Sequence, residues 1–244
     1  MKFENTEVWG FEHALRGMRN PKNSWDRSDS VFGYDNCDSC EHNYLCSECY
    51  IHDPNDYAIE APIFGTNDME LAQKLIKAGS EHRKFMRQIF VSVDITAPLF
   101  WWKEFDTYKV GTVANSTSTM HKLASTPITL DCFEIDDYEE IRLGNLNPKF
   151  IITYCEDLRQ KYLETKDKKY WKELIRWLPE SWLQTRTVTM SYENLLAMCS
   201  KGQRRFHKLN EWSGQDDNTK PNFISWARTL PYAQELIFID EVEE

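Results

Sequence analysis

The chain has 244 residues, a formal net charge of −10 and many aromatic residues, with nine Trp, eleven Tyr and thirteen Phe. A disordered chain lacks such groups, and the acidic balance excludes a protein that binds nucleic acid through bulk electrostatics. No apolar run approaches the length of a membrane span, about 18 residues, and the charged N-terminus is not a signal peptide. We therefore expect a cytoplasmic protein with neither a membrane nor bulk nucleic acid as its partner.

The predicted elements begin with a short N-terminal element over about residues 5–16, followed by a polar, turn-rich stretch. A helix then begins near Asn67, because Asn67 and Glu70 form a capping-box pattern before an apolar stripe. Gly79 is expected to end this helix, and a charged helical segment over about 80–87 follows.

An alternating run of apolar and polar residues over 89–95 predicts a half-buried strand. Pro98 suits the first turn of the next helix, expected over about 98–109. We expect Trp101 and Trp102 of this helix to pack in the core rather than to stack on a bound ring, because large aromatic side chains are usually packed.

The second half of the chain has helical apolar spacing and few strand signals. Helices are expected over about 131–143, 148–165, 168–178, 188–200 and 222–230. The acidic run Asp136-Asp137 and Glu139-Glu140 is more typical of a solvated helix face than of a metal site. These elements together predict a helix-rich α+β chain.

A cysteine cluster lies in a loop or insertion over residues 35–57. Its spacing is Cys-x2-Cys-x5-Cys-x2-Cys, formed by Cys37, Cys40, Cys46 and Cys49. Four thiolates in two pairs are the set that Zn²⁺ prefers, and they leave no open position, so a zinc ion here would be structural. An iron–sulfur cluster, a site in which His42 or His52 replaces a thiolate, and four unligated thiols are the alternatives. The remaining cysteines are expected to be buried thiols in helices: Cys132, Cys155 and Cys199.

Residues 79–121 contain a Glu-His pair, Glu81-His82, then the predicted strand, then an Ala-Pro helix start at Ala97-Pro98. In this order the stretch resembles the core of flavin-dependent thymidylate synthases, also called thymidylate synthase complementing proteins. A looser resemblance covers residues 178–237. The resemblance implies one domain over 1–244, with a central antiparallel sheet flanked by long helices. It also implies a homo-oligomer, a tetramer in that family.

The chain resembles a divergent member, because the family's Gln-x-x-Arg-His-Arg motif and the loop after it are altered. The Gln falls on Glu104, the Arg-His-Arg triplet on Thr107-Tyr108-Lys109, the loop Glu on Ser116 and the loop Arg on Met120, whereas Asn115 and Ser118 are kept. Arginine forks bind phosphates bidentately, whereas lysine offers a point charge. These replacements therefore disfavour an unaltered pose of a nucleotide monophosphate.

The resemblance assigns roles to individual residues. As catalytic residues it implies Glu104 and Ser118; for FAD binding, His82, Arg83, Lys109 and Asn115; for substrate binding, Arg87, Ser116, Ser118, Arg204, Arg205 and His207. For each cation the alternative is a solvated surface charge, and for His82 it is a hydrogen-bonded structural histidine. The alternative for the pair Arg204-Arg205 is a surface turn.

The activity implied by the resemblance is methylation of dUMP to dTMP with FAD, NADPH and methylenetetrahydrofolate. In such an enzyme the flavin carries the reacting groups and the protein mainly orients the ligands. The alternative is a relative that keeps a nucleotide pocket but has lost or changed the reaction. In both cases the expected ligand is a small-molecule nucleotide.

Overall fold

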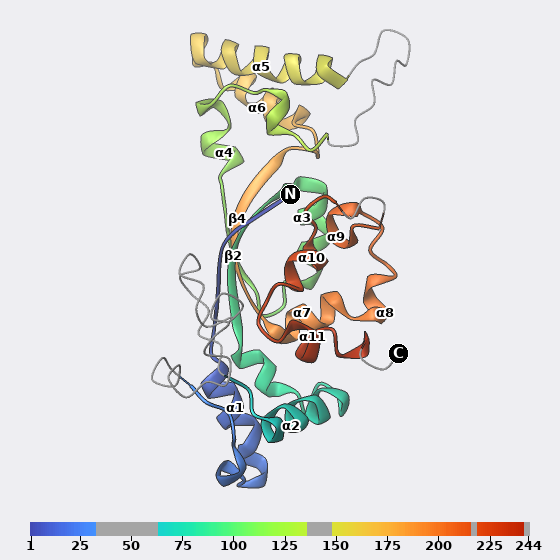
Figure 1. Ribbon diagram of the computed structural model, residues 1–244. Coiled ribbons are helices and arrows are strands. Elements are labelled where there is room, and N and C mark those ends of the chain that lie inside the picture. The colour runs from blue at the N-terminus through green and yellow to red at the C-terminus, as the bar shows by residue number, and fades with distance from the viewer. Residues whose placement is uncertain (33–62, 136–147, 216–218, 242–244) are drawn as a thin grey trace, which may run out of the picture. The chain divides into compact units, whose positions relative to one another are not determined.

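The computed structural model describes residues 1–32, 63–135, 148–215 and 219–241 (Figure 1). The predicted zinc ligands Cys37, Cys40, Cys46 and Cys49 lie outside these residues, as does the acidic run from Asp136 to Glu140. Within the described residues, no group of three or more His, Cys, Asp or Glu side chains is arranged to hold a metal ion. No helix among them is long and apolar enough to cross a membrane.

A four-stranded antiparallel sheet runs through the described chain. Its strands are β1 (Lys2–Trp9), β2 (Phe90–Pro98), β3 (Val113–Ser116) and β4 (Leu183–Ser191), in the order β1-β2-β4-β3. The register of β2 and β4 is marked by hydroxyl pairs, Ser92 with Thr189 at 2.5 Å and Thr96 with Thr185 at 2.7 Å. The predicted helix-rich α+β fold with a central antiparallel sheet is confirmed.

The described helices follow the chain order shown in Figure 1. They are α1 (Phe11–Arg19), α2 (Thr66–Lys77), α3 (Leu99–Phe105), α4 (Thr119–Lys122), α5 (Pro148–Thr165), α6 (Lys168–Trp177), α7 (Tyr192–Cys199), α8 (Lys201–Arg204), α9 (Asn210–Ser213), α10 (Phe223–Ala227) and α11 (Ala233–Leu236). Short 3₁₀ turns lie between several of them, including one at Lys84–Gln88.

The chain divides into two compact units. Unit 1 comprises Met1–Lys2, Ile95–Thr107 and Asn115–Thr187, and unit 2 comprises Phe3–Asp94, Tyr108–Ala114 and Val188–Glu244. The single domain expected over residues 1–244 stays a prediction.

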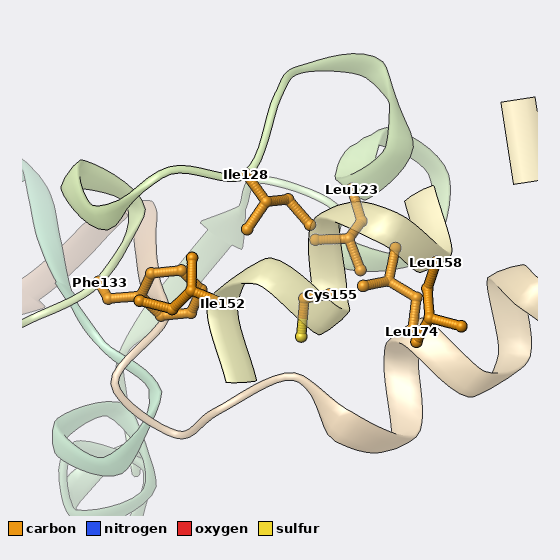
Figure 2. Close-up of a cluster of buried hydrophobic side chains, with 7 residues drawn as sticks. All are labelled: Leu123, Ile128, Phe133, Ile152, Cys155, Leu158 and Leu174. Atoms are coloured by element: carbon orange, nitrogen blue, oxygen red, sulfur yellow. The ribbon is translucent and has the colours of Figure 1, made fainter. Parts of the chain in front are cut away.

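The core of unit 1 lies between α5, α6 and the segment from α4 to Phe133, as Figure 2 shows. Its buried members are Leu123, Ile128, Phe133, Ile152, Cys155, Leu158 and Leu174. Burial raises the pKa of the Cys155 thiol to about 11, so this cysteine stays neutral and unreactive at physiological pH. Cys199 of unit 2 is likewise buried, whereas Cys132 is half-exposed in a 3₁₀ turn.

Unit 2 depends on two close approaches at glycines. Gly10 links β1 to α1 with φ +93°, and a Cβ at this position would lie 2.1 Å from the carbonyl oxygen of Gln88. A Cβ on Gly65 would collide with the Asp29 side chain at 2.2 Å. Only glycine leaves room for both contacts.

The cap of α2 differs from the prediction. Asn67 does not cap this helix, whose N-cap is Gly65 without any side-chain bond. Instead the Asp29 carboxylate accepts hydrogen bonds from the backbone N–H of Asn67 at 2.9 Å and of Asp68 at 3.1 Å. A distant carboxylate therefore satisfies the free N–H groups that a local capping box usually satisfies. The predicted stop is confirmed, because Gly79 follows the helix with φ +105°.

Other expected boundaries need correction. The predicted helix over 188–200 is wrong at its start, because β4 continues to Ser191 and α7 begins only at Tyr192. The N-terminal element is a strand followed by a helix, and residues 80–87 form a turn and a 3₁₀ segment. Apolar spacing over a few residues does not distinguish strand from helix, which explains the first error.

Candidate functional site

In unit 2 the first turn of α7 is the point on which several predicted site residues converge. Strand β4 ends at Ser191, whose side chain accepts from the backbone N–H of Asn194, while the Asn194 side chain bonds back to the Ser191 backbone. This capping box fixes the start of the helix. Glu193 and Asn194 then point to two different partner segments.

Glu193 binds two arginines for which the sequence predicts ligand binding. Arg83 donates through Nε to Glu193 at 3.3 Å, and Arg87 donates to both carboxylate oxygens, through Nη2 at 3.2 Å and through Nε. Burial alone would raise the pKa of Glu193, but the bonds from Arg87 and Arg83 outweigh it and lower that pKa. The carboxylate therefore stays ionised and cancels one of the two guanidinium charges.

Asn194 holds the loop that carries part of the altered triplet. Its Nδ2 donates to the carbonyl oxygen of Val110 at 2.8 Å, and the loop turns at Gly111, where φ is +80°. Lys109 precedes this contact with an exposed side chain and, among described residues, has no ion pair. The segment that carries Arg83 and Arg87 and the loop that follows Lys109 therefore both contact the first turn of α7.

Tyr108, the middle residue of the triplet, is packed rather than free. Its hydroxyl accepts a hydrogen bond of 2.6 Å from Gln203, and its ring lies edge-on to His207 and Trp212. His207 is 1% exposed, stacks on Trp212 with ring centroids 4.3 Å apart, and its Nε2 lies 3.0 Å from the carbonyl oxygen of Met198. A carbonyl only accepts, so Nε2 carries a proton, and the buried ring supports Tyr108.

The two arginines of the predicted pair Arg204-Arg205 have different surroundings. Arg204 forms an ion pair with Glu241, which also accepts from Arg228 at 2.8 Å. Arg205 is exposed, with its guanidinium 4.7 Å from the ring centroid of Phe206. His82 is an exposed turn residue whose backbone N–H donates to the Gly79 carbonyl oxygen.

The predicted residues of unit 1 lie on α3, on β3 and at the start of α4. Asn115 and Ser116 are exposed at the end of β3. The Ser118 hydroxyl accepts from the His121 backbone N–H at 3.0 Å and so caps α4. Glu104 lies on α3, where its carbonyl oxygen accepts from the hydroxyl of Thr107 at 2.7 Å.

The paired tryptophans of α3 are core residues, as expected. Trp101 and Trp102 are 0% and 1% exposed. The indole N–H of Trp102 donates to the Gln184 carbonyl oxygen at 2.9 Å, and the guanidinium of Arg186 lies 4.2 Å from the centre of its ring. Arg186 also pairs with Asp106 at 3.0 Å, so α3 is fixed to β4 by a cation over a buried ring.

Sequence reasoning missed Glu193, Asn194 and Arg186. The pattern Ser191-x-x-Asn194 is a capping signal that would have placed the helix start, and with it the outward-facing Glu193. Arg186 lies in the middle of a strand, and no local pattern marks it.

Comparison with solved structures identifies the fold. A flavin-dependent thymidylate synthase ThyX from Helicobacter pylori, complexed with FAD and dUMP, aligns with a TM-score of 0.63 over 98% of this chain and 99% of its own, at 14% identity. The chain has the fold of a flavin-dependent thymidylate synthase. A second Helicobacter pylori ThyX structure with FAD and dUMP aligns over 100% of both chains, with a TM-score of 0.59 and 12% identity. No protein-family model and no curated protein sequence matches the chain.

Proposed function

We propose that this protein binds FAD and a nucleotide and methylates dUMP to dTMP with NADPH and methylenetetrahydrofolate. The observation that carries the proposal is the match over nearly the whole of both chains with a synthase whose structure contains FAD and dUMP. Because a fold does not fix a function, the proposal also depends on whether the residues of this chain suit anionic ligands.

The cations of unit 2 suit a diphosphate. Lys109 is exposed and has no ion pair to a described residue, and the Nη atoms of Arg83 have no bond to one. His82 is exposed beside Arg83. In the proposal these side chains and Asn115 bind FAD, which would supply the hydride and one-carbon transfer. The ammonium group of Lys109 contributes a point charge, and the planar guanidinium of Arg83 fixes the orientation of the bound phosphate.

The nucleotide is proposed to contact the residues to which the resemblance assigns substrate binding. Arg87, Ser116, Ser118, Arg204 and Arg205 would bind it, whereas the burial of His207 suits support of Tyr108 better than direct contact. Glu104 and Ser118 would act at the reacting ring. The Ser118 oxygen that accepts from His121 still has its O–H proton to donate.

One observation favours a second candidate, a relative that binds a nucleotide without methylating dUMP. Glu193 cancels one of the charges of Arg83 and Arg87, and the family's central arginine triplet carries a single cation here, Lys109. A nucleotide monophosphate is a dianion, and fewer cations hold it less tightly. Such a protein would bind a nucleotide or flavin for sensing or sequestration.

An assay of dTMP formation separates the two candidates. Purified protein is incubated with dUMP, FAD, NADPH and methylenetetrahydrofolate, and dTMP is measured by mass spectrometry. Turnover that Ser118→Ala or Lys109→Ala lowers supports the enzyme. Binding of dUMP or FAD without turnover supports the second candidate, and the absence of both contradicts each of them.

From the sequence we also propose a metal site, an oligomeric state and a cellular location. Cys37, Cys40, Cys46 and Cys49 would hold one structural zinc ion, the chain would form a homo-oligomer, a tetramer by resemblance, and it would act in the cytoplasm. Elemental analysis and native mass spectrometry test the first two together. One zinc per chain and a mass of four chains are expected, and a metal-free monomer contradicts both.

A further inference from the structure

A polar pocket in unit 2 lies apart from every residue assigned above. It lies between the end of α1, the turns that follow it and the first half of α2, and the two helices contact each other (Figure 1). Its volume is about 620 Å³, which suits a small ligand. Among the described residues that line it, Leu71 is the one apolar side chain, so the pocket does not resemble one for a flat ring.

The floor of the pocket is a buried arginine that is held in place from one side. Arg19 is 3% exposed, and its Nε donates to Asp68 at 2.6 Å. Asp68 is fully buried and also accepts from the hydroxyls of Ser28 and Ser30, each at 2.7 Å. The Nη1 of Arg19 donates to the Ser24 carbonyl oxygen at 3.2 Å. Both side chains are therefore fixed by groups that belong to the fold.

The third nitrogen of this guanidinium has no partner. Within the described part of the chain, Arg19 Nη2 is buried and forms no hydrogen bond. A buried N–H group without an acceptor destabilises the fold, and a bound ligand that supplies the acceptor removes this penalty. Arg19 lines the pocket, so an acceptor there would complete its set of bonds.

The rim of the pocket is rich in cations that the fold does not use. Lys22, Arg27 and Lys74 line it with Arg19, against the two carboxylates of Asp26 and Glu70. None of the three rim cations forms an ion pair with a described residue. Because Arg19 is paired with Asp68, the three rim cations exceed the two rim carboxylates by one charge. A concave surface with excess positive charge and little apolar area attracts a compact anion.

We propose that this pocket binds a phosphate group, either inorganic phosphate or the phosphate of a small polar phosphoester. Arg19 would donate to it from the floor, and Lys22 and Lys74 would neutralise it from the rim. The pocket shares no residue with the proposed FAD and nucleotide site, so this ligand is an additional one.

Calorimetric titration of the full-length protein with inorganic phosphate and, separately, with glucose 6-phosphate tests the proposal. Lys22→Gln/Lys74→Gln keeps Arg19 and the fold, and we expect it to weaken binding by about tenfold or more, since each lysine makes a charge-assisted contact. The matched control is Lys168→Gln/Lys172→Gln, two exposed lysines of α6, which should leave the affinity unchanged. Tighter binding of the sugar phosphate identifies a phosphoester, and equal binding identifies phosphate itself; both support the site.

Three results would overturn the proposal. The first is that neither probe binds saturably. The second is that the two double variants bind phosphate with equal affinity. The third is that Lys109→Ala loses phosphate binding whereas Lys22→Gln/Lys74→Gln retains it. The last result would place the phosphate at the proposed nucleotide site. A failure of FAD or dUMP binding leaves this pocket untouched, so the two proposals fail separately.

Discussion

Two neighbouring segments of the chain differ in how far they follow the thymidylate synthase pattern. Residues 90–105 form β2 and α3, with alternate side chains of the strand buried and both tryptophans in the core. Residues 107–121 contain the altered triplet and loop, and most of their side chains are exposed. The first segment packs in the core because its apolar residues recur at regular spacing, and many different sequences satisfy such a pattern.

The second segment depends on single polar groups, which are not interchangeable. Tyr108 accepts a hydrogen bond from Gln203 and packs on His207 and Trp212, whereas an arginine at a phosphate site donates several hydrogen bonds. The chain therefore has the fold, while other residues stand at the positions of the family's polar motif. The fold and the proposed activity therefore have separate determinants, which substitutions can address one at a time.

The largest effect is expected from a substitution in the apolar segment, residues 90–105. Trp102→Ala removes a fully buried ring, its bond to the Gln184 carbonyl and the surface on which Arg186 lies. It should lower the free energy of unfolding by about 3–5 kcal/mol, measured by urea denaturation. Thr107→Ala, an exposed position of the altered segment, should change it by under about 1 kcal/mol. Equal losses in the two variants would contradict the comparison.

A smaller loss is expected at the turn between β1 and α1. Gly10→Ala places a Cβ 2.1 Å from the Gln88 carbonyl oxygen at a residue with φ +93°. The strain should cost roughly 1–3 kcal/mol in the same denaturation experiment. Gly202→Ala is the control, because its Cβ would meet no atom within 4 Å. A Gly10→Ala protein as stable as the parent would show that the fold does not require the close contact between Gly10 and the Gln88 carbonyl oxygen.

The charge balance of the altered site is tested by Glu193→Gln. Removal of the carboxylate leaves Arg83 and Arg87 without a counter-charge, so binding of dUMP should tighten by about three- to tenfold at low ionic strength and by less at high salt. Glu7→Gln, an exposed carboxylate of β1, is the control for net charge. Weaker binding in calorimetry would show instead that Glu193 serves to orient the arginines.

The smallest effect concerns acid stability. Hydrogen bonds from Arg159, with lesser ones from Ile128 and Gln160, hold the pKa of Glu156 at about 2, below its ordinary 4.5. This stabilisation is complete above pH 4.5 and is lost as the pH falls towards about 2. Glu156→Gln should therefore lose less stability across that interval than the parent protein. Glu164→Gln, at an exposed carboxylate of the same helix, should follow the parent, and an identical fall in both variants would refute the assignment.

The elements with long apolar repeats were predictable from sequence. Helix α5 has the predicted bounds, α6 ends one residue early, and β2 buries the predicted alternate residues. The start of α7 was not predictable in this way, because Val188 and Met190 suit a strand as well as a helix. The Asp29 cap of α2 joins residues 38 and 39 positions apart, beyond the reach of any local capping pattern.

The candidate site was only partly predictable. The sequence indicated Arg83, Arg87 and Lys109, but the carboxylate that binds the arginines lies 110 and 106 residues away from them. His207 looked like an anion-binding group beside two arginines, yet its ring is buried under Trp212. Charge and residue type indicate which side chains suit a ligand, whereas tertiary partners decide which of them are free for it.

Titration of the purified protein with FAD, followed by flavin fluorescence and visible absorbance, measures directly whether the chain binds a flavin. We expect saturable binding of one FAD per chain, weakened in Lys109→Ala and unchanged in Lys168→Gln. A protein that takes up no FAD at any concentration would contradict the claim that the thymidylate synthase fold of this chain still serves a flavin.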